Sequence, residues 1–447
     1  MNMNDLAVTG YNLIWYIFKP FWWSLSVLCP APFRDLSTSS SERTMRNLHL
    51  KARLGMMIEN LALTKPGALW IHALSAGEVL SALPLAKTLC SIRKHAGITL
   101  PLIMSASTLS GFNILTSSGL SLDEAFIMPL DAPWLMTKLV NRIRPSIFVL
   151  IEGDVWPNLL RSLKSVGTRC FLVNARMSPA SFLGYKRLNK LGINIFSYFD
   201  AIFLASPNMR RFYCEFVDES KVFFLGNLKW DAAREKAVPV EERSTIMEEL
   251  GIAENTPVWI AGSVHAGEEE AILRAHKKIL SRIPDAILML APRNVPGDVE
   301  RFEKVCTRMG FTVVKRSGGE RVSRPATVYL IDTLGELMRF YSIANVAFVG
   351  GSLIPKGGHN LMEPAIYGIP VCWGPYVFNF QDIAENLENS EQGAEVNGRT
   401  LPDFILQRLL ATQSLHGSSR PSRSLFNSGS PTVNVLSEIF NMVLSLF

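Results

Sequence analysis

The residues best suited to hold an anionic ligand lie in the stretch 346–374, VAFVGGSLIPKGGHNLMEPAIYGIPVCWG. The apolar run that opens it predicts a buried parallel strand, and a glycine-rich loop follows. Glycines let the backbone approach a ligand closely, and N–H groups at a helix start attract an anion. His359, Asn360 and Glu363 stand at the start of a helix expected at 360–368, where they could reach the sugar or phosphate of a nucleotide.

The same helix start also has a purely structural interpretation. Asn360 and Glu363 have the spacing of a capping box, in which a cap residue is followed three positions later by an acid. Thr333 and Glu336 repeat this spacing. The glycine pattern is neither GxGxxG nor a Walker A loop, so it names no cofactor by itself.

Acidic side chains follow two expected strands in the first half of the chain. Glu78 ends the run IHALSAGE after the strand expected at 68–73, where a carboxylate is well placed to act as a general base. Ser75 with Glu78 is again a possible capping box. Glu152 and Asp154 in EGDVWPN could hold a divalent metal, contact an acceptor or order the loop. We favour the acceptor or the loop, because no further Asp, Glu or His stands nearby.

Cationic residues could neutralise a phosphate. Lys229 lies in GNLKWD, where the alternative is a solvated linker lysine, and Arg293 suits a bidentate phosphate contact. Because the carboxyl ends of parallel strands meet at one edge of a sheet, we expect the following residues to lie together there. They are Ser263, Arg293, Gly335 and Asn360.

The composition bounds the class of protein. With 447 residues the chain is long enough for two or three domains. The net charge of +6 suits an anionic partner, namely a nucleotide, a phospholipid surface or a phosphorylated lipid. No basic run or recognised binding module stands in the sequence, so no nucleic-acid partner is expected. The 6 cysteines form no CxxC pair and are interpreted as reduced core residues of a cytosolic compartment.

Residues 11–32 are dense in Trp, Tyr and Phe and predict a membrane anchor within a first segment, 1–50. Lys19 and Pro20 interrupt the run, so a tilted span, a helix lying in the interface and a buried helix of the first domain all stay open. Basic residues follow the run, which predicts that the body of the protein lies on the cytoplasmic side.

Apolar runs then alternate with amphipathic helical stretches, which predicts α/β domains with doubly wound parallel sheets. The expected strands are 68–73, 100–104, 125–128, 147–151, 170–173 and 201–205, then 258–261, 287–290, 312–314, 328–331, 346–349 and 369–373. The expected parts are a first Rossmann-like domain at 51–228, a linker at 229–243, a second such domain at 244–412, and a loose segment with a C-terminal helix at 413–447. The ligand is expected in the cleft between the two domains.

Together these motifs resemble those of the 3-deoxy-D-manno-octulosonic acid (Kdo) transferase family of lipopolysaccharide assembly. The family's runs are HAVSVGE, ETELWPN, NARLS, GNLKFD, STHEGEE, PRH, DTMGEL and VGGSLVPxGGHNxLEP. Here they stand in the same order as HALSAGE, EGDVWPN, NARMS, GNLKWD, SVHAGEE, PRN, DTLGEL and VGGSLIPKGGHNLMEP. The resemblance reaches from the anchor to about residue 390. It implies a GT-B fold, with two Rossmann-like domains facing a central cleft.

The resemblance also implies the reaction and the residues that carry it. The donor would be CMP-Kdo and the acceptor a lipid A precursor, lipid IVA, at the inner membrane. Glu78 would be the general base, and Glu152 and Lys229 would stabilise the transition state, with inversion and without a cofactor or a protein-bound metal. The residues implied to hold CMP are Pro292, Arg293, Leu334, Gly335, Glu336, Asn360, Leu361, Met362 and Glu363, to which the sheet-edge argument adds Ser263.

Some residues differ from the family's runs, and other classes of protein stay open. Asn294 stands where the family has His, and Gly153-Asp154 where it has Thr-Glu, which bears on phosphate contact and acceptor choice. Other classes are a different GT-B nucleotide-sugar transferase or epimerase, and a membrane-bound nucleotide-binding scaffold without turnover. A dinucleotide-dependent oxidoreductase is disfavoured, because no GxGxxG follows the first strand of either half.

Overall fold

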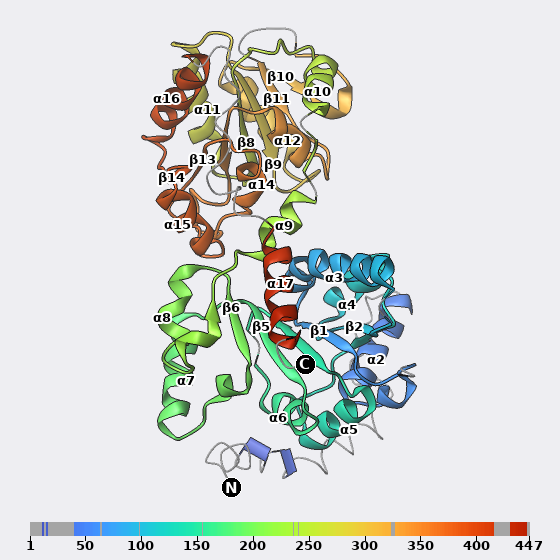
Figure 1. Ribbon diagram of the computed structural model, residues 1–447. Coiled ribbons are helices and arrows are strands. Elements are labelled where there is room, and N and C mark those ends of the chain that lie inside the picture. Colours follow the sequence, from blue (N-terminus) through green and yellow to red (C-terminus); the bar gives the residue numbers. More distant parts are fainter. Residues whose placement is uncertain are drawn as a thin grey trace. The chain divides into compact units, whose positions relative to one another are not determined.

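The chain forms two compact units in the computed structural model (Figure 1). Unit 1 comprises Met1–Ala232 and Gly429–Phe447, and unit 2 comprises Ala233–Ser428. The structure describes residues 11–12, 15–16, 40–62, 65–97, 99–153, 155–235, 237–239, 241–322, 327–414 and 430–444. The boundary between the units falls within the linker expected at 229–243.

Most of the aromatic segment 11–32 lies outside the described residues. In the part of the chain that is described, no helix combines the length and the apolar character needed to cross a membrane. The anchor therefore stays a prediction.

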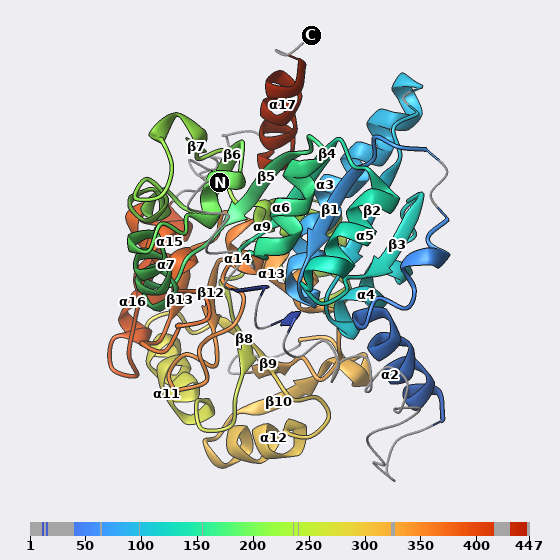
Figure 2. The ribbon, with the colours of Figure 1, turned by 90° about the horizontal axis from the view of Figure 1, so that it is seen from below.

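Unit 1 is built on a 7-stranded parallel sheet in the order β3-β2-β1-β4-β5-β6-β7. Figure 2 shows β3, β2, β1, β4 and β5 side by side in this order. The strands are β1 (Leu69–Ala73), β2 (Leu102–Ala106), β3 (Glu124–Ile127), β4 (Ile147–Ile151), β5 (Arg169–Ala175), β6 (Ala201–Leu204) and β7 (Val222–Phe223). All but β7 were expected, and β7 is too short to show a pattern.

Most helices of unit 1 lie between these strands, while α2 precedes β1, α9 follows β7 and α17 lies near the end of the chain. The helices are α2 (Ser40–Arg53), α3 (Ala76–Ala96), α4 (Leu109–Ser117), α5 (Pro133–Ile143), α6 (Pro157–Ser165), α7 (Pro179–Lys190), α8 (Arg210–Tyr213), α9 (Leu228–Arg234), which crosses the boundary, and α17 (Pro431–Leu444). Both faces of the sheet are thereby covered, which is why its strands read as continuous apolar runs.

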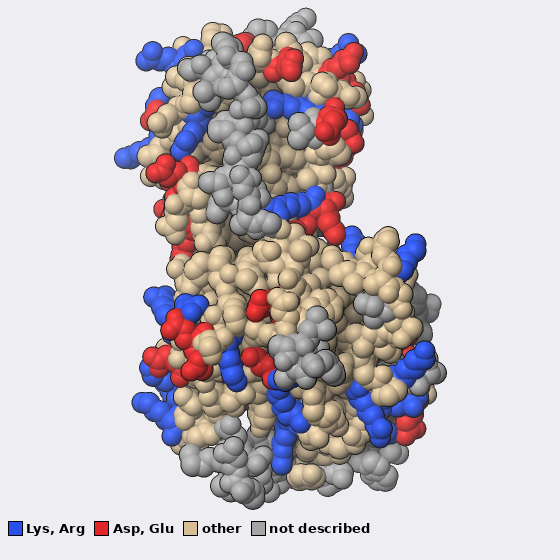
Figure 3. Space-filling model, viewed as in Figure 1, with Lys and Arg blue, Asp and Glu red and all other residues tan. Residues whose placement is uncertain are grey.

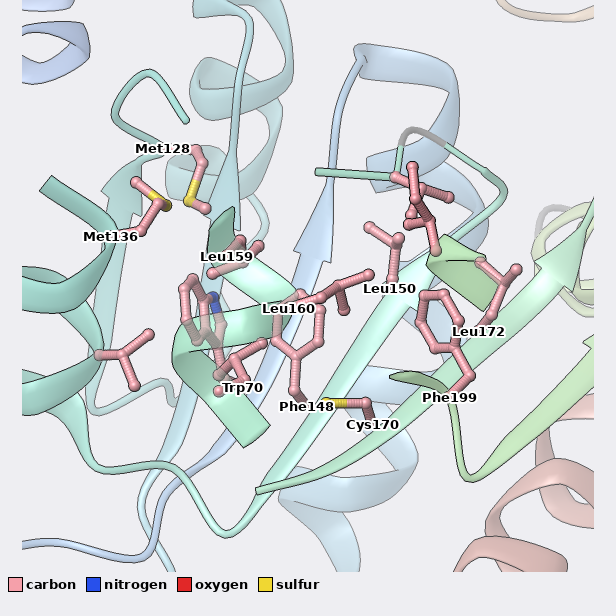
Figure 4. Packing of buried hydrophobic residues seen from close by; sticks show 14 of the residues in the cluster. Trp70, Met128, Met136, Phe148, Leu150, Leu159, Leu160, Cys170, Leu172 and Phe199 are labelled. Atoms are coloured by element: carbon pink, nitrogen blue, oxygen red, sulfur yellow. The ribbon is translucent and has the colours of Figure 1, made fainter. Parts of the chain in front are cut away.

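Figure 4 shows how the strands of unit 1 bury one of these faces. Trp70, Phe148 and Cys170 are register neighbours on β1, β4 and β5 and point to the same side. Leu159 and Leu160 of α6 cover them there. The opposite face packs against α3 and α17.

Helix α17 brings the end of the chain back onto unit 1, beside α3 (Figure 1). Its Val435, Leu436 and Ile439 are buried in the same core cluster as the apolar side of α3. Asp231 of α9 fixes the start of α17, because its Oδ2 accepts a hydrogen bond from the backbone N–H of Thr432 at 2.7 Å. The C-terminal helix expected within 413–447 is therefore present and packs on unit 1.

Unit 2 repeats the plan with a 7-stranded parallel sheet in the order β10-β11-β9-β8-β12-β13-β14. Its strands are β8 (Val258–Val264), β9 (Ile287–Pro292), β10 (Thr312–Lys315), β11 (Thr327–Leu330), β12 (Val346–Val349), β13 (Val371–Trp373) and β14 (Gly393–Glu395). Its helices are α10 (Glu242–Leu250), α11 (Glu269–Leu280), α12 (Val299–Arg308), α13 (Leu337–Ile343), α14 (Met362–Ala365), α15 (Gln381–Asn389) and α16 (Leu401–Ser414). Strand β14 was not expected, since its sequence GAE carries no apolar run.

The buried side of α17 yields a test of the fold. Ile439→Ala should lower the free energy of unfolding by about 2–4 kcal/mol, because it removes buried methyl groups and leaves a cavity. Val433→Ala on the exposed side of the same helix should change it by no more than about 0.5 kcal/mol. Urea unfolding measures both, and equal effects of the two substitutions would contradict the packing of α17.

Candidate active site

Near its middle, each sheet has a point where the order of its strands reverses. It lies between β1 and β4 in unit 1 and between β8 and β12 in unit 2. Ligands of open α/β sheets bind outside the carboxyl ends of the strands at such a point. Glu78 and Glu152 follow β1 and β4, and His265 and His359 follow β8 and β12. The candidate residues of both units therefore lie where the topology places a ligand.

Glu78 lies in the first turn of α3. Its Oε2 accepts a hydrogen bond from the backbone N–H of Leu74 at 2.5 Å, and the Ser75 side chain makes no cap bond. The reciprocal capping box expected for Ser75 and Glu78 is thus wrong, because the carboxylate closes back on the loop before the helix. The helix start, with its partial positive charge, stabilises an anion at this place.

His72, in the same sequence run, has a structural role. It is completely buried in β1, where its Nδ1 lies 2.8 Å from Ser105 Oγ. Burial lowers the pKa of His72 to about 3, so the ring is neutral at physiological pH. It positions β1 against β2 and cannot supply a proton to a substrate.

Glu152 and Lys229 are brought together in unit 1. Lys229 Nζ lies 2.7 Å from Glu152 Oε1, with both side chains mostly buried. Asn174 Nδ2 donates to the same oxygen at 3.4 Å. A carboxylate and an ammonium thus form a partly desolvated pair at the carboxyl edge of the sheet.

The rest of the EGDVWPN run is structural where it is described. Asn158 and the start of α6 are held by Asp131, whose Oδ2 accepts from the Asn158 N–H at 3.0 Å. The guanidinium of Arg53 lies over the Trp156 ring, with its Cζ 5.2 Å from the ring centre. A Cβ at Gly153 would lie 2.9 Å from the carbonyl oxygen of Arg176, so a larger residue here would require the backbone to shift. Asp154 lies outside the described residues.

In unit 2 a buried carboxylate organises the glycine-rich loop. Glu268 is fully buried, and its two oxygens accept four backbone N–H hydrogen bonds of 2.7–3.1 Å. The donors are His265, Gly351, Ser352 and Leu353. The loop does collect N–H groups around an anion, as its glycines led us to expect. That anion, however, is a carboxylate of the protein.

The backbones around this carboxylate are packed without room for side chains. A Cβ at Gly350 would lie 2.6 Å from the carbonyl oxygen of Ser263. Ser263 itself has φ 56, in the left-handed region, where the register between β8 and β9 shifts. The loop after β12 therefore depends on glycine and on the unusual backbone of Ser263.

His265 and His359 form a hydrogen-bonded pair across the reversal point of unit 2. Their Nε2 atoms lie 2.8 Å apart, with the rings nearly parallel at 5°. Burial, with the charges of His265 and Arg293, lowers the pKa of His359 to about 4. One ring donates to the other, and His359 is neutral at physiological pH.

The structure places the residues expected to hold CMP at one edge of the sheet, at the carboxyl ends of β8 and β9 and in the loops after β9, β11 and β12. Leu361 and Met362 are buried, so only their backbones can face a ligand. Helix α14 begins at Met362, not at Asn360 as expected. Asn360 Oδ1 accepts from the Met362 N–H at 3.2 Å and its Nδ2 donates to Glu363 at 3.3 Å, so this pair caps the helix.

Glu336 pairs outside its own helix. Arg316 donates to both of its oxygens at 2.9–3.2 Å, and Thr333 Oγ1 donates at 2.5 Å. The Arg316 hydrogen bonds, against some desolvation, keep the pKa of Glu336 below its usual value. The expected capping box is wrong, since Glu336 is itself the cap position of α13. Leu334, by contrast, is 72% exposed beside it.

Several residues of this site were missed in the sequence. They are Asn174, His265, Glu268 and Arg316. The first three stood within the family-like runs NARMS and SVHAGEE, which is the signal that could have found them. Arg316 lies in no such run and is revealed only by its contact with Glu336.

The Glu268 hydrogen bonds predict a large effect of an isosteric change. Glu268→Gln places an NH2 group against backbone N–H donors and should lower the free energy of unfolding by about 3 kcal/mol. The control Glu270→Gln, in the first turn of the helix that Glu268 precedes and with half-exposed ion pairs, should change it by less than about 1 kcal/mol. Denaturant unfolding checks both, and a Glu268→Gln protein as stable as the control would refute the role of this carboxylate.

The His359 pKa predicts how stability changes with pH. The folded pKa of about 4 lies below the ordinary value of 6.5, so the folded state binds fewer protons between them. The stabilisation by His359 is complete above about pH 6.5 and is lost as the pH falls toward about 4. Urea unfolding of wild type and His359→Gln near about pH 7 and about pH 5 should show a steeper pH dependence for wild type. Parallel slopes would exclude a neutral His359.

Comparisons with known proteins identify the family. The family described as 3-Deoxy-D-manno-octulosonic-acid transferase (kdotransferase) matches residues 48–232. The 3-deoxy-D-manno-octulosonic acid transferase of Haemophilus influenzae is 30% identical over 92% of this chain and 94% of its own.

Two solved structures are also similar. The C-terminal CMP-Kdo binding domain of WaaA from Acinetobacter baumannii is 31% identical over 39% of this chain and 93% of its own, with a TM-score of 0.36. The UDP-GlcNAc 2-epimerase of Neisseria meningitidis bound to UDP-GlcNAc is 12% identical over 84% of this chain and 100% of its own, with a TM-score of 0.56. The epimerase shares the GT-B-like fold of two parallel-sheet α/β domains, and at this identity the fold alone.

The relative from Haemophilus influenzae matches nearly the whole of both chains, and the residues of the matching runs lie at the carboxyl edges of both sheets. The chain belongs to the 3-deoxy-D-manno-octulosonic acid (Kdo) transferase family and is a glycosyltransferase.

Proposed function

We propose that this enzyme transfers Kdo from CMP-Kdo to a lipid A precursor, lipid IVA, in lipopolysaccharide biosynthesis. The observation that carries the proposal is the set of charges at the carboxyl edge of unit 1. Glu78 is fixed at the start of α3, and Glu152 and Lys229 form a pair 2.7 Å apart. A carboxylate placed for proton abstraction at the same sheet edge as a fixed carboxylate–ammonium pair suits the attack of a sugar hydroxyl.

In the proposed reaction an acceptor hydroxyl attacks the anomeric carbon of Kdo while Glu78 takes its proton. The bond from that carbon to the CMP phosphate oxygen breaks, and CMP leaves as an anion. Attack from the face opposite the leaving group inverts the anomeric centre. Lys229 and Arg293 would offset the negative charge that develops, so the protein needs to hold no metal ion for this purpose.

The CMP site is proposed on unit 2, at residues Ser263, Pro292, Arg293, Leu334–Glu336 and Asn360–Glu363. Because Gly351, Ser352 and Leu353 give their N–H groups to Glu268, these donors are not the ones that bind phosphate. Arg293 is the cation of this edge best suited to bind the phosphate, since its charge lowers the pKa of His359 beside the reversal point.

The protein is proposed to work at the inner membrane, with its catalytic body on the cytoplasmic side. The aromatic segment 11–32 and the net charge of +6 support this location, since the acceptor is a phosphorylated lipid. Figure 3 shows basic side chains spread over unit 1 on the face drawn, with acidic side chains among them. Most of the membrane contact would then come from the anchor segment, and not from a continuous basic patch on this face.

A transfer assay with CMP-Kdo generated in situ and tetra-acyl lipid A precursor tests the proposal. Wild type should add Kdo to the acceptor, and mass spectrometry should show the added mass and how many units are attached. Glu78→Gln should lower kcat by about 10²–10⁴-fold, because the amide still accepts the Leu74 hydrogen bond but takes no proton. The Kd for CMP, measured by calorimetry, should stay unchanged.

Glu215→Gln is the matched control, since this exposed carboxylate of unit 1 pairs with Lys186 on the surface. It should leave turnover at the wild-type level. Full turnover of Glu78→Gln would exclude Glu78 as the base. No mass added by wild type that binds CMP would refute lipid IVA as the acceptor.

A further inference from the structure

Asn174 stands at the end of β5 in a conformation that few residues adopt. Its φ is 59, in the left-handed region, and its side chain is buried, with 1% exposed. The register between β5 and β6 shifts between Val173 and Ala175, so the strand is irregular at this residue. Among residues other than glycine, Asn is one of those that tolerate this backbone best.

The side-chain amide of Asn174 donates one hydrogen bond and accepts another. Its Nδ2 donates to Glu152 Oε1 at 3.4 Å, and its Oδ1 accepts from the backbone N–H of Leu228 at 3.2 Å. Leu228 is the first residue of α9, and Lys229 follows it. One amide therefore contacts the carboxylate of the pair directly and fixes the helix that carries the ammonium.

The backbone of Glu152 is interlocked with the same segment. Glu152 also has a positive φ, 70. Its N–H donates to the Val173 carbonyl at 2.8 Å, and its own carbonyl accepts from the Arg176 N–H at 3.1 Å. Residues on both sides of Asn174 thus hold Glu152 in a conformation that costs free energy and persists only where its surroundings fix it.

We propose that Asn174 is a positioning residue for catalysis, whose amide holds Glu152 Oε1 and the start of α9 in register so that the Glu152–Lys229 pair is preorganised. The inference rests on the proposed role of that pair in the transition state. Charges fixed before the reaction stabilise a transition state without reorganisation, and small displacements of such groups lower the rate strongly.

Asn174→Gly tests the amide separately from the backbone. Both variants lose the acceptor for the buried Leu228 N–H, but glycine accepts the left-handed φ, so the Tm of Asn174→Gly should stay above that of Asn174→Ala. We expect kcat of Asn174→Gly to fall by about 10–100-fold, with the Kd for CMP unchanged. Arg144→Gly is the matched control, because Arg144 is another left-handed residue of unit 1, exposed at the end of α5. It should retain wild-type kcat.

Asn174→Asp tests the role through the pH dependence of kcat, which would not change if Asn174 served packing alone. At neutral pH its carboxylate would repel Glu152 and lose the donor, but a shared proton at lower pH restores an O–H donor to Glu152. The charged groups on the surrounding segments are Glu152, Arg176, Lys229 and Asp231, and Asp231 is engaged by Thr432. The ratio of variant to wild-type kcat should therefore rise as the pH falls from about 8 to about 6.

The outcomes separate this inference from the function it rests on. If Glu152→Gln and Lys229→Met lower kcat but Asn174→Gly does not, the positioning role is refuted. A pH-independent kcat ratio for Asn174→Asp would refute it as well. If Glu152→Gln and Lys229→Met turn over like wild type while Glu78→Gln is inactive, the role of the pair itself fails.

Discussion

The ligand edge of unit 2 depends on one buried anion, the carboxylate of Glu268. Burying a carboxylate in a protein interior costs several kcal/mol unless its oxygens are fully hydrogen-bonded. Here four backbone N–H groups from two loops provide those bonds. The loops follow β8 and β12, the strands on either side of the reversal point. The carboxylate therefore fixes the shape of the edge where the nucleotide is proposed to bind, and it occupies the N–H groups that glycine-rich loops often offer to a phosphate.

Backbone strain is concentrated at the same edges. Among the described residues other than glycine, those with positive φ are Arg144, Glu152, Asn174, Ser263 and Glu391. Glu152 follows β4, Asn174 lies near the end of β5 and Ser263 near the end of β8, so three of them lie at the carboxyl ends of strands. Such conformations persist only where the surroundings over-determine them. Asn174 and Ser263 coincide with register shifts in the two sheets, where the regular alternation of side chains is interrupted.

The sequence predicted the parallel sheets well, because strands buried on both faces are continuous apolar runs. It missed β7 and β14, which carry no such run. Its capping boxes at Glu78 and Glu336 failed for a different reason. A spacing of three residues permits a local hydrogen bond but does not exclude a stronger partner elsewhere. Glu336 accepts hydrogen bonds from Arg316, which lies on another segment. The positions of candidate acids and bases followed from topology alone, whereas the contacts of Asn174 and Glu268 depend on side-chain directions that no spacing reveals.

The likeness to UDP-GlcNAc 2-epimerases shows how far a fold can specify a reaction. Two doubly wound sheets determine where substrates bind, at the reversal points, and leave the chemistry to the side chains placed there. In this chain the side chains proposed to carry the reaction belong to unit 1. Helix α9 crosses the boundary between the units, yet its first turn is held to unit 1 by Asn174 at Leu228 and by Asp231 at Thr432. Lys229 lies between these two fixed points. Its charge is therefore fixed at the carboxyl edge of unit 1, where Glu152 and the proposed base Glu78 also lie.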